Sequence, residues 1–122
     1  MSKQEQFMAI IRELRENVPD ITGVMIATVD GLAIATDFPE DEAARVAAMG
    51  ASSIGLGNRM TKVAEIGEMK DMLIEGKDGL LVIYMSGSGG ILALRAPARA
   101  NLGLIRLDGP SAARKVAEVM VS

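Results

Sequence analysis

The stretch from Pro39 to Glu65 limits the possible folds more than any other part of this chain. It carries no charge between Val46 and Gly57, and a proline followed by three acidic residues is typical of a helix N-terminus. Helical spacing arranges its residues in two stripes. The bulky stripe contains Val46, Met49, Ser53, Leu56, Met60 and Val63. The small stripe contains Ala43, Ala47, Gly50, Ile54, Gly57 and Thr61.

Two stripes are more than a helix on the surface of a monomer needs, because one apolar stripe is enough to attach it to a core. Each interior glycine also costs roughly 1 kcal/mol relative to alanine in a helix. Close approach by another element would offset that cost. We therefore expect one stripe to face the protein's own core and the other to face a partner.

Composition narrows the class of protein. A length of 122 residues predicts a single domain over 1–122, and 49% hydrophobic residues exclude a disordered chain. A net charge of −3 and only three aromatic residues argue against nucleic acid as a partner. The longest uncharged run, 79–94, is too short to cross a bilayer, and residues 1–6 lack the apolar run of a signal peptide. We therefore expect a cytoplasmic protein without membrane insertion.

The flanking sequence predicts two further helices and five strands. A capping box at Ser2–Glu5 opens a helix that Asn17 and Pro19 end. A last helix covers Asn101–Val121, where Asp108-Gly109-Pro110 leaves two possibilities: one kinked helix, which we favour, or two pieces. The expected strands are Ile21–Val29, Leu32–Thr36, Glu68–Glu75, Leu80–Met85 and Ile91–Arg95.

The resulting order, α-β-β-α-β-β-β-α, indicates an α+β fold with a five-stranded antiparallel sheet between helices. Ile21–Val29 and Leu80–Met85 are apolar on both faces, so both faces of the sheet need cover, whereas the charges in Glu68–Glu75 indicate an edge strand. The first and last helices can share one face and leave the central helix alone on the other. We expect the bulky stripe to lie on the sheet and the small stripe on a partner helix.

No set of residues in the chain predicts catalysis. There is no His and no Cys, which removes the commonest bases, nucleophiles and metal ligands. The Ser86–Gly90 loop lacks the lysine of a phosphate-binding loop and precedes a strand, so it is better explained as a hairpin turn. The carboxylates of Asp37 and 40–42 suit a helix N-terminus. We expect no catalytic residue, cofactor or metal.

Self-association is the function that the residues themselves favour. The small stripe can meet a copy of itself, and the charged edge strand can pair with its twofold mate, as in the commonest oligomers. The predicted dimer contacts are Ala43, Ala47, Gly50, Ile54 and Gly57 on the helix, with Met69, Asp71 and Leu73 on the strand.

Two segments resemble the roadblock (dynein light-chain) family. Gly23–Leu32 is similar to its first hairpin, and Asn101–Arg106 is similar to the start of its last helix. The element order and the Ala/Gly-rich middle helix agree over nearly the whole chain. The resemblance implies a profilin-like or longin-like sandwich and a homodimer joined through the third strand and the central helices. Asp108-Gly109-Pro110 departs from the uninterrupted last helix of the family.

The same resemblance implies a partner. MglB-like prokaryotic members act on small Ras-like GTPases, which would dock near the paired central helices. Candidate contacts are Arg45, Arg59 and Lys62, where Arg59 could act as an arginine finger, although a solvated surface charge is the favoured interpretation. We expect a non-enzymatic regulator or scaffold of such a GTPase. The alternative is a small-ligand sensory module with a pocket beneath the Ser-Gly loop, and an enzyme ranks third.

Overall fold

The computed structural model describes all 122 residues and has the predicted order of three helices and five strands. The elements are α1 Lys3–Asn17, β1 Gly23–Thr28, β2 Ala33–Thr36, α2 Glu40–Val63, β3 Asp71–Glu75, β4 Gly79–Ser86, β5 Gly90–Pro97 and α3 Leu102–Val121. The predicted α+β class and the antiparallel sheet are confirmed.

The five strands form one antiparallel sheet in the order β2-β1-β5-β4-β3. β1 and β4 both pair with β5, and β3 pairs only with β4, for example Leu73 with Val82. β3 is therefore an edge strand, as its charges predicted. The last three strands form a meander because tight turns join them.

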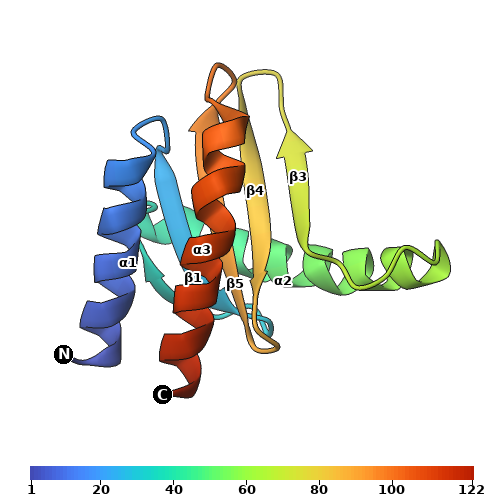
Figure 1. The fold of residues 1–122 in the computed structure, drawn as a ribbon, viewed down its shortest axis with the longest axis horizontal. Helices are drawn as coiled ribbons and strands as arrows, with labels where there is room; N and C mark the ends of the chain where they lie inside the picture. Colours follow the sequence, from blue (N-terminus) through green and yellow to red (C-terminus); the bar gives the residue numbers. More distant parts are fainter.

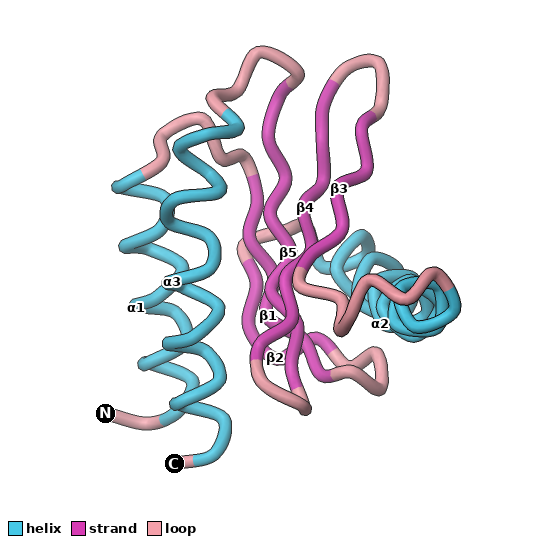
Figure 2. The backbone as a smooth tube through the Cα atoms, turned by 45° about the vertical axis from the view of Figure 1, so that its right-hand side comes forward, coloured by secondary structure: helices cyan, strands magenta, loops and turns pink.

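Helices cover the two faces of the sheet unequally. α1 and α3 lie side by side on one face, and α2 lies alone on the other (Figures 1 and 2). Alternation along β4 explains this arrangement, since Val82 and Tyr84 face α1 and α3 while Ile83 faces α2. A cluster of 19 buried residues fills the first layer and one of 10 fills the second.

The two outer helices begin where the sequence places their caps. The Ser2 hydroxyl accepts the Glu5 N–H at 3.1 Å, and the Ser2 N–H donates to the Glu5 carboxylate at 3.0 Å, which completes the capping box. The Asn101 side chain accepts the Leu104 N–H at 3.1 Å and caps α3. Each cap satisfies backbone donors that the helix itself leaves without partners.

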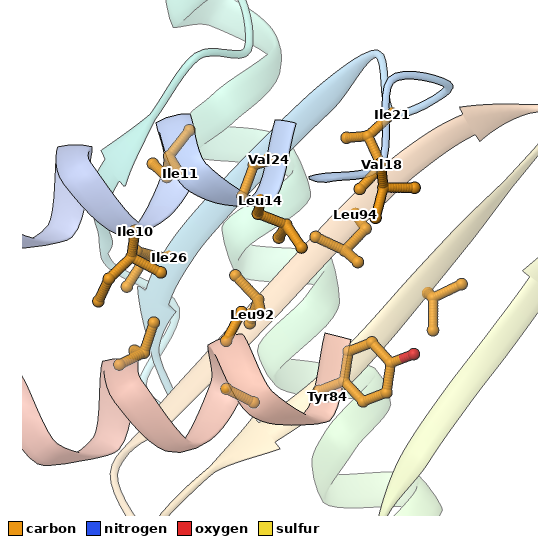
Figure 3. Packing of buried hydrophobic residues seen from close by; sticks show 14 of the residues in the cluster. Ile10, Ile11, Leu14, Val18, Ile21, Val24, Ile26, Tyr84, Leu92 and Leu94 are labelled. Carbon is orange, nitrogen blue, oxygen red and sulfur yellow. The ribbon is translucent and has the colours of Figure 1, made fainter. Parts of the chain in front are cut away.

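α3 is one continuous helix with Pro110 inside it, so the prediction of one helix rather than two pieces is confirmed. Gly109 lies directly over the ring of Tyr84, a buried side chain whose place in the core is seen in Figure 3. A Cβ at position 109 would lie 2.5 Å from a ring carbon of Tyr84. The glycine is therefore explained by close packing between α3 and β4.

The orientation of α2 differs from the prediction. Its small stripe faces the sheet, where Ala43, Ala47, Gly50, Ile54 and Gly57 are buried, and its bulky stripe is largely exposed. The two stripes were thus predicted the wrong way round. The physical reason is the shape of the sheet surface: a Cβ at Gly50 would lie 3.3 Å from Cδ1 of Ile91, so small residues let the helix backbone approach large strand side chains.

Candidate functional site

The bulky stripe of α2 exposes several large apolar side chains. Met49, Leu56 and Met60 are each more than half exposed, and Val63 is 85% exposed. The C-terminal part of α2 projects past the edge strand β3, and the segment that follows α2 runs back along it toward β3 (Figure 1). Exposed apolar stripes of this kind are typical of surfaces that contact a protein, a membrane or a ligand.

A groove extends this surface onto the sheet. It has a volume of about 650 Å³ and lies between the N-terminal half of α2 and the β3–β4 hairpin. Val46 and Met49 form one wall, and Ile74 and Leu81 line it from the strands. The exposed side chain of Ile74 places the apolar surface of the helix next to that of the sheet edge. Together, the bulky stripe and these groove residues are called the α2–β3 surface below.

Arg95 also lines the groove, and the sequence alone did not reveal its role. Its guanidinium lies 4.6 Å from the centre of the Phe38 ring, 3.6 Å from the Glu42 carboxylate and 3.3 Å from the Thr22 carbonyl oxygen. These contacts tie the start of α2 to the sheet. The sequence feature that could have identified Arg95 is that it is the only charged residue in a strand that is otherwise apolar on both faces.

The three predicted contacts on the edge strand occupy different environments. Met69 is buried in the loop before β3, and its sulfur would lie 2.4 Å from a Cβ at Gly57, so it packs on α2 of the same chain. Asp71 is half-buried, with a carboxylate oxygen 3.9 Å from the guanidinium of Arg106. Leu73 is exposed. The outer backbone groups of β3 have no strand beside them.

The three predicted GTPase contacts are not brought together. Arg45 is held on its own helix, because its Nε donates to the Asp41 carbonyl at 3.3 Å and its guanidinium lies 3.9 Å from the Asp41 carboxylate. Arg59 and Lys62 are exposed and form no ion pair. At about 1.5 Å of rise per residue, Arg45 and Arg59 lie roughly 21 Å apart along the helix.

Asp37, Asp41 and Glu42, before and within the first turn of α2, have structural partners. Asp37 accepts the Val24 N–H at 2.8 Å and forms an ion pair with Arg15. No three His, Cys, Asp or Glu side chains cluster closely enough to hold a metal ion. None of the helices combines the length and the apolar character needed to cross a membrane.

One buried ionisable group lies on the opposite face of the sheet. Burial raises the pKa of the Tyr84 phenol above its ordinary value of 10.0, the negative charge of Asp71 raises it further, and Arg106 opposes both effects. The phenol oxygen has no hydrogen-bond partner. Its packing beneath Gly109 indicates a structural role.

Comparison with known proteins agrees with the fold. Residues 9–96 match the family model of the Roadblock/LC7 domain. The uncharacterised protein MJ1340 of Methanocaldococcus jannaschii is 35% identical over 97 residues, which are 79% of this chain and 84% of that protein.

Solved structures give the same result. A Roadblock/LC7 domain from Streptomyces avermitilis has a TM-score of 0.87 and 22% identity, covering 93% of this chain and 97% of that one. MglB of Myxococcus xanthus has a TM-score of 0.84 and 19% identity over 94% of each chain. The match to the family model, the identity to the archaeal relative and the shared architecture show that this chain belongs to the Roadblock/LC7 domain family.

Proposed function

We propose that this chain, as one domain over residues 1–122, forms a homodimer that regulates or scaffolds a small Ras-like GTPase and has no catalytic site of its own. The observation that carries the proposal is the α2–β3 surface, where exposed apolar side chains on α2 continue into an apolar groove at an edge strand. Family membership supports it, because MglB has this fold.

The geometry of the α2–β3 surface suits a twofold partner. An identical chain can add its own β3 to this edge strand, with Leu73 among the facing residues, and lay its own α2 along the bulky stripe. The projecting end of α2 then packs on the partner. This arrangement uses the same two elements as the predicted dimer, α2 and β3, but the contact on α2 is made by the bulky stripe instead of the small one.

The dimer is tested by Leu56→Glu, with Ala48→Glu as the matched control on another exposed side of the same helix. Full burial of leucine contributes about 1.5–3 kcal/mol, and symmetry loses the contact twice, so we expect the dimer to weaken by about 3–6 kcal/mol, or roughly 10²–10⁴-fold in Kd. Sedimentation equilibrium measures this change. A monomeric wild type, or equal effects of both variants, would contradict the proposed surface.

GTPase binding is the finer part of the proposal. Arg59 and Lys62 are exposed cations without ion-pair partners, close to the projecting end of α2, and can contact a partner. An arginine supplied in trans can raise GTP hydrolysis by roughly 10³–10⁵-fold, whereas a regulator that repositions switch loops needs no such residue. We expect the second mode, with these two cations contributing to association.

The test uses the wild-type dimer and a Ras-like GTPase encoded in the same genome. Binding and single-turnover hydrolysis are measured with the GTPase in both nucleotide states. We expect binding in at least one nucleotide state. Arg59→Ala or Lys62→Ala should weaken binding several-fold but should not lower the rate of GTP hydrolysis in the bound complex, as the loss of an arginine finger would. The neutral control is Ser52→Ala on the same helix. No binding in either state refutes the GTPase proposal and leaves the dimer test unaffected.

A further inference from the structure

A second cavity lies on the opposite face of the sheet from α2. It has a volume of about 840 Å³ and lies between the β4–β5 turn and the ends of α1 and α3. The turn and both chain ends are at the same end of the molecule (Figure 1). Neither the α2–β3 surface nor the proposed GTPase contacts use this cavity.

The floor of the cavity carries hydroxyl groups. Gly90 pairs with Thr28 on one side and with Ser86 on the other, so the three residues form a row across the sheet. Ser86 is 2% exposed, and its Oγ has no hydrogen-bond partner. The Thr28 hydroxyl accepts the Leu32 N–H at 3.1 Å and keeps its own proton for donation. A buried hydroxyl without a hydrogen-bond partner is unusual, and a bound ligand could supply that partner.

The walls above this floor are apolar and adaptable. Phe7, Ile34 and Met120 line the cavity from three different elements. The Met120 side chain lies over Gly90, since its sulfur would be 2.4 Å from a Cβ at that position. Methionine is flexible and sits here in the last turn of α3, so a rotamer change can open the floor to a ligand.

Charge at the mouth of the cavity is balanced. Lys3 and Glu118 both line it, and the Lys3 ammonium donates to the Met120 carbonyl oxygen at 3.1 Å. The two opposite charges offset each other, so the site does not favour a strongly charged ligand. Apolar walls with a few converging polar groups are typical of small-molecule sites.

We propose that this cavity binds a small neutral molecule with an apolar body and one hydroxyl, carbonyl or amide head. The Ser86 hydroxyl bonds the head, and Phe7, Ile34 and Met120 contact the body. Binding orders the end of α3 and the Gly87–Gly89 turn, which both line the cavity. This site is additional to the GTPase proposal and does not depend on it.

The test compares benzyl alcohol with toluene, which has the same ring but no hydroxyl head. Each probe is titrated into the intact protein and followed by backbone amide NMR. We expect saturable shifts at the Gly87–Gly89 turn and the last turn of α3 with both probes. Ser86→Ala should weaken benzyl alcohol several-fold and leave toluene unchanged, because a single hydrogen bond is lost.

Ser52→Ala on the exposed side of α2 is the matched control and should bind both probes like the wild type. The amide spectrum of Ser86→Ala shows whether that variant keeps its fold. Shifts that do not saturate, shifts confined to α2, or equal weakening of both probes by Ser86→Ala would overturn the proposal.

Discussion

Replacing Gly109 with alanine tests whether the packing of α3 on Tyr84 explains the glycine. The new Cβ would lie 2.5, 2.6 and 2.7 Å from three atoms of the Tyr84 side chain. Tyr84 is 3% exposed and its ring is rigid, so it cannot move aside without disturbing the core. The contact is far shorter than an ordinary van der Waals separation of about 3.5–4.0 Å.

The magnitude follows from two opposing terms. Overpacking a core costs about 1–3 kcal/mol, and three short contacts to a buried ring place this site at the upper end. Alanine regains roughly 1 kcal/mol over glycine inside a helix. We therefore expect Gly109→Ala to lower the free energy of unfolding by about 2 kcal/mol, which corresponds to roughly 6–10 °C in Tm for a chain of this size.

Gly55→Ala is the matched control. Gly55 is exposed in α2, and a Cβ there would meet nothing within 4 Å, so only the helix propensity changes. We expect a gain of roughly 1 kcal/mol in the free energy of unfolding. Both variants are measured by urea unfolding at one protein concentration, because the proposed dimer would make stability depend on concentration.

A double-mutant cycle identifies the cause. In a Tyr84→Leu background the ring is gone, so Gly109→Ala should no longer destabilise, and we expect a coupling energy of about 2–3 kcal/mol. The reasoning fails if Gly109→Ala is as stabilising as Gly55→Ala, or if its cost is unchanged when the ring is absent.

Two further predictions concern the same face of the sheet. Because the raised pKa keeps the Tyr84 phenol protonated in the folded chain, the unfolded chain binds fewer protons above its ordinary value of 10.0. The free energy of unfolding should therefore fall as pH rises from about 9 to 11, more steeply in the wild type than in Tyr84→Phe. Because Tyr84 is the only tyrosine, the absorbance change that reports its ionisation should appear only when the chain unfolds. Asn101→Ala removes the side-chain acceptor of the Leu104 N–H and should lower the free energy of unfolding by about 1 kcal/mol, whereas Asn101→Gly should lower it by only a few tenths. An unchanged free energy of unfolding for Asn101→Ala in urea would show that the cap does not stabilise the helix.

Much of the fold could be predicted because it rests on local signals. The capping box at Ser2 and the unbroken apolar run from Leu80 each specify a backbone conformation or a degree of burial. Charges in the third strand indicated an edge, and the structure confirms it. Arg95 could not be interpreted in this way, since its partners Phe38, Glu42 and Thr22 come from distant parts of the chain.

The two stripes of α2 show how far residue spacing can predict the candidate surface. The sequence by itself determined that α2 has two apolar stripes and that only one can face the sheet, because helical periodicity depends on residue spacing alone. It could not determine which stripe, since both have the same period. The choice depends on packing against strands that are distant in the sequence. The large side chains of Ile83 and Ile91 leave room for alanine and glycine, so the small stripe packs on the sheet and the bulky stripe remains exposed.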